Sequence, residues 1–251
     1  MQYKGIDVSS WNGEIDWKAV ADSGVQFVMI RAGTGSRKGT VKKDTFFERN
    51  IAAAYENGIL CGIYLYSYAD SVESAIGEAR ALLDVITPYR SRIRFPVAFD
   101  MEENSRISLG ADTLTNMANA FCTEIRKAEF RPMVYANLNW LRNYLKTAEI
   151  SDDIWLAQWS SRPTWNGDYR IWQYSDSGTV PGIRGNVDLD YADTLYEPAP
   201  EPPLTVEDAI SRLTKAEILD SPDYWRGAVD GSITASIDNI SALLIKMAGL
   251  L

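Results

Sequence analysis

Short apolar runs alternate with amphipathic stretches over most of the chain, and this alternation limits the folds that the chain can adopt. Four stretches carry apolar residues at helical spacing: 15–24, 44–58, 71–87 and 111–128. Asp16 and Asp44 stand at helix-starting positions, and Gly24 and Gly58 stand at helix-ending positions. The short runs have the length of strands and span 5–9, 27–33, 61–67, 95–102, 132–137, 154–159, 170–175 and 186–191. Strands separated by helices favour an α/β fold with parallel strands.

The alternation weakens after residue 137. The last three runs begin near residues 154, 170 and 186, and the gaps between them leave little room for full crossover helices. We therefore expect an α/β barrel whose later half is poor in helices and partly antiparallel.

A proline-rich segment interrupts the chain at 197–204 (EPAPEPPL), which holds four of the ten prolines. This segment cannot continue a helix or a central strand, so it is typical of a stiff linker. The sequence thus predicts a catalytic barrel over 1–196 and a separate module over 205–251. Pro222 suits a helix start, and 232–251 has apolar residues at helical spacing. We expect a small all-α module with a role in binding or association.

The composition narrows the chemistry. The chain has no histidine and two cysteines, Cys61 and Cys122, which excludes Ser-His-Asp and Cys-His nucleophiles and both His-ligated and all-thiolate zinc sites. Carboxylates, amides and phenols must therefore carry any catalysis. The net charge of −9 argues against binding nucleic acid or an anionic membrane surface. No apolar run approaches the roughly 20 residues that span a bilayer, and the first residues show no signal-peptide pattern.

Acidic residues lie on three of the predicted strands. Asp100 and Glu102 end the run FPVAFDME, and because alternate strand residues share a side, both point away from the side that Phe99 faces. Asp7 lies near the end of the first run, and Asp188 lies on the last. The first and last strands are neighbours in a closed barrel, so we expect the four carboxylates to converge at its mouth. Inward acids are costly unless they serve such a site.

Each acid also has a structural alternative. Asp7 could cap the turn SSWNG, and Asp188 or Asp190 could form hydrogen bonds within a loop. Asp100 with Glu102 is the pair that a purely structural role explains least well. Agreement between three strand ends favours one site over three separate structural roles.

Several motifs occur together along the chain. GIDVSSWNG, FDME, YAN, WLAQW, IWQYS and GNVDLDY, in this order, resemble glycoside hydrolase family 25, the Chalaropsis-type lysozymes of phage endolysins and bacterial autolysins. The resemblance covers residues 3–195. It implies a flattened TIM-like β/α barrel whose acidic groove cleaves peptidoglycan between N-acetylmuramic acid and N-acetylglucosamine, with no metal and no cofactor.

The resemblance also implies a role for each acid. Glu102 is expected to be the general acid, and Asp100 its partner, which stabilises positive charge or orients the substrate's 2-acetamido group. Asp7 and Asp188 are expected to be the other two acids of the groove. Crowding and desolvation would raise the pKa of Glu102 and keep it protonated. The close spacing of Asp100 and Glu102 favours retention of configuration, with the substrate's own acetamido oxygen as an alternative nucleophile.

Aromatic and amide side chains on the later strands are the expected sugar-binding residues. They are Tyr64, Tyr66, Tyr135, Asn137, Gln158, Trp172 and Gln173. Flat amphipathic rings suit sugar faces, and packing in the core is the alternative. Strand alternation lets only one of Trp172 and Gln173 face the groove.

Two other functions compete with a peptidoglycan hydrolase. A chitinase-like barrel typically has a further acid two places before Asp100, where this chain has Ala98. A catalytically silent wall-glycan-binding protein is disfavoured by the intact Asp100 and Glu102. A metal-dependent wall amidase is excluded by its missing ligands.

The module over 205–251 has two open roles, binding to the bacterial cell wall or self-association into a homo-oligomer. Its acids outnumber its bases, so wall affinity would depend on specific contacts rather than on charge attraction to anionic polymers. We expect the protein to be made in the cytoplasm of a host bacterium and to reach the wall through a holin pore or at lysis.

Overall fold

The structure is a computed structural model that describes residues 2–196, 210–211, 213–214, 218–236 and 239–240. The chain divides into two units, Met1–Ala199 and Pro200–Leu251. Among the described residues, no helix combines the length and the apolar character needed to cross a membrane.

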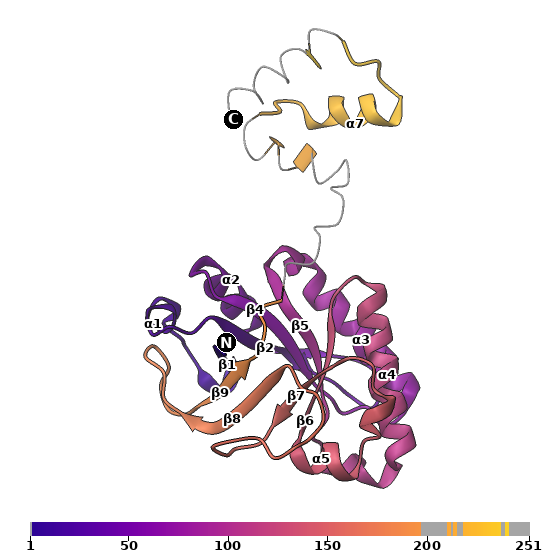
Figure 1. Ribbon diagram of the computed structural model, residues 1–251. Helices are drawn as coiled ribbons and strands as arrows, with labels where there is room; N and C mark the ends of the chain where they lie inside the picture. The colour runs from indigo at the N-terminus through magenta and orange to yellow at the C-terminus, as the bar shows by residue number, and fades with distance from the viewer. Residues whose placement is uncertain (1, 197–209, 212, 215–217, 237–238, 241–251) are drawn as a thin grey trace. The chain divides into compact units, whose positions relative to one another are not determined.

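Eight strands of the first unit close into a barrel (Figure 1). Around the barrel each strand pairs with the next, and β1 closes the circle by pairing with β2. A two-residue strand, β3 (Lys42–Lys43), extends the sheet beside β2. In order around the barrel, the strands are β1 (Tyr3–Val8), β9 (Val187–Ala192), β8 (Ile171–Gly178), β7 (Asp153–Ala157), β6 (Pro132–Asn137), β5 (Ile93–Asp100), β4 (Leu60–Tyr66) and β2 (Phe27–Thr34).

The barrel is mixed, as the sequence predicts. Strands β1, β2 and β4 to β8 pair in parallel, whereas β9 is antiparallel to both β1 and β8. The later half is also poor in helices, because the described residues 158–170 between β7 and β8 contain no helix. Both expectations for the barrel are therefore confirmed.

Five helices cover the outside of the barrel (Figure 1). The Asp16 side chain accepts a hydrogen bond from the Ala19 amide and so caps the first helix, as predicted. The prediction that a helix starts at Asp44 is wrong, because both carboxylate oxygens of Asp44 bind backbone amides of Phe46 and Ser10 and the helix begins only at Phe47. The helices are α1 (Trp17–Asp22), α2 (Phe47–Glu56), α3 (Val72–Ile86), α4 (Ala111–Lys127) and α5 (Leu138–Asn143).

The hydrophobic core has two layers. Inside the barrel, the rings of Phe27 and Phe95 stack with centroids 4.6 Å apart. Outside it, Phe99 stacks on Phe121 of α4 at 4.3 Å. The inner layer has no room for a side chain at position 62, since a Cβ on Gly62 would lie 2.4 Å from the Met29 sulfur. Because Phe99 faces the helices, its neighbour Asp100 faces the barrel interior.

In the second unit, one helix is described in full. Helix α7 (Pro222–Asp230) starts with Pro222 in its first turn, as predicted, and Gly231 at φ +81° ends it. The expectation of a helix over 232–251 is wrong for its first residues, because Ile233 folds back and its amide donates to the Gly227 carbonyl at 2.8 Å. The predicted linker at 197–204 and most of the stretch around 205–219 lie outside the described residues.

Candidate active site

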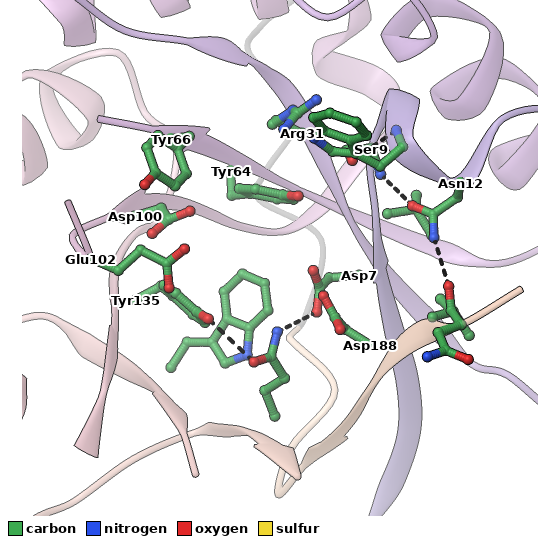
Figure 2. A pocket seen from close by; sticks show the side chains of 16 residues that line it. Asp7, Ser9, Asn12, Arg31, Tyr64, Tyr66, Asp100, Glu102, Tyr135 and Asp188 are labelled. Atoms are coloured by element: carbon green, nitrogen blue, oxygen red, sulfur yellow. Dashed lines mark hydrogen bonds between the residues drawn. The ribbon is translucent and has the colours of Figure 1, made fainter. Parts of the chain in front are cut away.

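A cavity of about 330 Å³ opens at the end of the barrel where the parallel strands finish. Eight of the residues that the sequence singles out line it together (Figure 2). They are the acids Asp7, Asp100, Glu102 and Asp188 and the side chains Tyr64, Tyr66, Tyr135 and Gln173. Each comes from a strand or from the residues directly after one.

Strand register brings these side chains to the same level. Asp7 of β1 is paired directly with Asp188 of β9. On β5, Asp100 is paired with Tyr66 on one side and with Tyr135 on the other. The acids therefore form two pairs on opposite walls of the cavity, Asp7 with Asp188 and Asp100 with Glu102, as Figure 2 shows.

A chain of hydrogen-bonded side chains runs from Asp7 to Tyr135 (Figure 2). Gln173 donates from Nε2 to Asp7 Oδ2 at 2.7 Å, and its Oε1 accepts from the Tyr135 hydroxyl at 3.2 Å. The same Oε1 accepts from Trp159 Nε1 at 3.0 Å. This amide thus connects one acidic wall to the tyrosine beside Glu102.

The surroundings of Glu102 favour its protonated form. Burial raises the pKa of Glu102, hydrogen bonding by Tyr135 lowers it, and the charges of Asp188 and Glu103 raise it further. The Tyr135 hydroxyl has a single proton and serves either Glu102 or Gln173 at one time. Burial also raises the pKa of Asp100 well above its usual range, and the charge of Glu102 adds to this effect.

The acids of the wall formed by Asp7 and Asp188 also have raised pKa values. Burial raises the pKa of Asp7 well above its usual range, and the charges of Asp190 and Asp188 reinforce the shift. Burial likewise raises the pKa of Asp188 and brings that of Asp190 to about 7. Neighbouring carboxylates in a desolvated site disfavour one another's ionisation.

Arg31 is the single cationic side chain among the residues that line the cavity. It donates from Nε to Asp44 Oδ2 at 2.8 Å and from Nη2 to Ser10 Oγ at 2.9 Å. Its charge lowers the pKa of Asp100, against the larger effect of burial. The sequence analysis did not propose Arg31 as a site residue. The signal for it was a cationic residue inside the apolar run FVMIRAG.

The turn after β1 contributes three further lining residues that the sequence analysis did not propose, Ser9, Trp11 and Asn12. Trp155 of β7, one of the aromatic residues of the later strands, also lines the cavity. Asp190 lies beside the cavity, fully buried, and accepts from Trp155 Nε1 at 2.8 Å. The turn sequence SSWNG directly after Asp7 was the available signal for the first three.

Three predicted sugar-binding residues lie outside the lining of the cavity, which corrects the expectation that they face it. Asn137 Oδ1 accepts from the Trp140 amide and starts α5. Gln158 Oε1 accepts from the Thr164 amide at 2.9 Å and orders the loop after β7. Trp172 points outward and donates to the Gln158 carbonyl, so Gln173 is the member of that pair that faces the cavity.

Comparison with known proteins assigns the chain to a family. The model of the glycosyl hydrolases family 25 matches residues 6–183, which include Asp7, Asp100 and Glu102. The chain belongs to this family. Asp188 lies just beyond the matched range, on the strand that pairs with Asp7.

The similarity to individual proteins extends over three quarters of the chain. The autolytic lysozyme of Clostridium acetobutylicum is 30% identical over 190 residues, covering 74% of this chain and 55% of that protein. The uncharacterized protein YegX of Escherichia coli K12 is 32% identical over 194 residues, covering 74% and 68%. The modular autolysin LytC of Streptococcus pneumoniae, solved in complex with a synthetic peptidoglycan ligand, superimposes with a TM-score of 0.68 at 28% identity. That match covers 76% of this chain and 46% of LytC, so this chain spans less than half the length of that autolysin.

Proposed function

We propose that this family 25 chain is an N-acetylmuramidase, which hydrolyses the β-1,4 bond between N-acetylmuramic acid and N-acetylglucosamine in peptidoglycan. One observation carries the proposal: carboxylates from β1, β5 and β9 meet in a single cavity on a family 25 barrel. Relatives named as lysozymes and an autolysin with a peptidoglycan ligand support the choice of substrate.

Glu102 is the proposed general acid. Its pKa is raised by burial and by the charges of Asp188 and Glu103, which favours the protonated form that a general acid needs to protonate the glycosidic oxygen as the bond breaks. Its position just beyond the end of β5 brings Glu102 to the mouth of the cavity, within reach of a bound glycan strand. The opposite acids, Asp7 and Asp188, contribute negative potential where positive charge develops on the sugar ring.

Asp100 is the proposed partner that orients the substrate. Its Oδ1 atom is buried and has no hydrogen-bond partner among the described residues. A buried acceptor without a donor costs roughly 1–3 kcal/mol, and the N–H of a substrate 2-acetamido group would satisfy it. This contact would aim the acetamido oxygen at the anomeric carbon, which is the geometry that substrate-assisted hydrolysis needs.

Loss of turbidity of purified cell walls tests the proposal. We expect the wild-type chain to clear the suspension and Glu102→Gln to slow clearance by roughly 10²–10⁴-fold, the usual contribution of a general acid. Glu73→Gln is the matched control, because this carboxylate lies on the exposed face of α3 and outside the cavity lining. Equal loss of clearance in both variants would argue against Glu102 as the acid, and binding without clearance by the wild type would indicate a silent glycan-binding protein.

The C-terminal module is proposed either to bind the bacterial wall or to join two copies of the chain. Light scattering and a wall pull-down, with and without residues 205–251, separate these roles. Release to the wall through a holin pore or at lysis stays an expectation from the sequence.

A further inference from the structure

Trp11 is the most exposed large apolar side chain among the described residues, with 88% of its surface exposed. By contrast, Trp17, Trp140, Trp155 and Trp172 are all buried. Leaving a large apolar side chain in water forfeits roughly 1.5–3 kcal/mol of burial. The position of Trp11 therefore has an explanation other than packing within the chain.

The backbone that carries Trp11 is held in place on both sides. Ser9 Oγ accepts from the Trp11 amide at 3.2 Å, and the Ser9 amide donates to Asn12 Oδ1 at 2.9 Å. Asn12 Nδ2 in turn donates to the Asn186 carbonyl at 3.4 Å, which joins the turn to the segment before β9 (Figure 2). A fixed turn that presents an aromatic ring to solvent is a preorganised binding surface, because little order is lost when a ligand arrives.

Trp11 lies between two cavities. Together with Asn12 it lines the acidic cavity and also a second, open cavity of about 960 Å³. The wall of the second cavity includes an ion pair between Glu14 and Arg49 of α2, with 2.7 Å between Oε1 and Nη1. A linear ligand that leaves the acidic cavity on this side passes over the indole ring.

We propose that Trp11 and the second cavity form an outlying glycan subsite, in which the indole ring stacks on a pyranose ring of the strand beyond the scissile bond. The inference rests on the proposed function, because a polymeric glycan supplies rings on both sides of the cleaved linkage. The volume of the acidic cavity, about 330 Å³, is at the small end of the range for ligand pockets. A bound glycan strand must therefore continue outside it. A flat apolar ring with an N–H at its edge suits the C–H face and the hydroxyls of a sugar.

Equilibrium binding of defined glycans tests this subsite. Full-length Glu102→Gln protein, with and without Trp11→Ala, is titrated with a disaccharide and a hexasaccharide of alternating N-acetylglucosamine and N-acetylmuramic acid. We expect Trp11→Ala to weaken hexasaccharide binding about tenfold, and disaccharide binding less than about twofold. Trp11→Phe keeps a flat ring and should recover most of the affinity.

Two controls separate a binding role from a structural one. Tyr55→Ala removes an aromatic side chain that is 42% exposed. Tyr55 lies near the end of α2 that leads into β4, so it is on the opposite rim of the barrel from the cavity. This change should alter the affinity for neither glycan. The melting temperature of Trp11→Ala should match that of the parent, since its ring contributes little burial. A shift of tryptophan emission on adding the hexasaccharide, smaller in Trp11→Phe than in the parent, gives a second readout.

The outcomes are distinct. Unchanged hexasaccharide binding in Trp11→Ala overturns the subsite. An equal loss for disaccharide and hexasaccharide also overturns it, because the ring would then bind the sugars at the cleaved linkage rather than those beyond it. A wild-type chain that neither binds nor cleaves these glycans contradicts the proposed function instead.

Discussion

The Glu102 carboxyl group must hold a proton when the glycosidic bond breaks, and its burial favours that state. A free glutamate titrates near pH 4.3. Because the pKa of Glu102 is raised, the fall in activity at alkaline pH should lie above that value. We expect Glu102→Gln to remove this alkaline limb from the pH dependence of kcat/KM, since an amide does not titrate. A residual profile with the limb unchanged would show that another group is the acid.

Asp190 should make the fold less stable as pH rises. Burial raises its pKa to about 7, whereas an aspartate in the unfolded chain titrates near 3.9. Between these values the folded state keeps a proton that the unfolded state has released, so stability falls as pH increases through this range.

The variant Asp190→Asn tests this linkage. Asparagine keeps an oxygen that can accept from Trp155 Nε1 but cannot ionise. We expect the two proteins to melt alike at pH 4 and the variant to melt at a higher temperature than the wild type at pH 8. Parallel melting curves across this range would contradict the burial of an ionisable Asp190.

The sequence could predict the acids, but not all of their partners. Strand alternation is enough to send Asp100 inward when Phe99 faces the helices. Asn137 lies at a strand end, like the cavity residues. An asparagine at such a position suits a helix cap equally well. In the structure Asn137 is the cap, because α5 begins at Leu138. The pairing of Arg31 with Asp44 depends on the tertiary structure, which local patterns do not specify.

Helix α3 is attached to the barrel mouth through a buried carboxylate. Glu78 is fully buried and accepts from Ser67 Oγ at 2.6 Å and from the Tyr68 amide at 3.1 Å, in the loop after β4. This loop directly follows Tyr66, which lines the active site. The helix thereby fixes the end of the strand that carries two cavity tyrosines.

Glu78→Ala should therefore destabilise the barrel. The change leaves two donors without an acceptor, at an expected cost of roughly 2–4 kcal/mol. Glu73→Ala, on the exposed face of the same helix, is the control and should cost less than about 1 kcal/mol. Urea unfolding monitored by circular dichroism measures both, and equal midpoints for the two variants would show that Glu78 does not hold the loop.

The secondary structure was largely predictable because local signals agree with the fold. The Asp16 cap and the positive φ of Gly24 and Gly58 mark helix ends that the sequence also marks. The start of α2 was not predictable, since Asp44 binds Ser10 and Arg31 from distant segments. Likewise, the first residues of 232–251 are not helical, because the Ile233 amide donates to the Gly227 carbonyl of α7, a contact that apolar spacing does not reveal.

At the level of the whole chain, catalysis should be independent of the C-terminal module, because all four acids lie in the first unit. We expect a chain shortened to 1–204 to hydrolyse soluble glycan fragments at the wild-type rate. Loss of wall pull-down on shortening would identify a wall-binding module, and loss of a dimer by light scattering would identify an association module. A shortened chain that cannot hydrolyse soluble fragments would contradict this division of roles.

The identity of the cleaved bond is the most direct test of the account. Purified walls are digested with the wild-type chain, the products are reduced with borohydride, and the muropeptides are analysed by mass spectrometry, with Glu102→Gln as the control. The four converging carboxylates of a family 25 barrel predict new reducing ends that are all muramic acid, formed by the wild type and lost in the variant. Reducing ends of glucosamine, or muramic acid ends formed equally by Glu102→Gln, would contradict it.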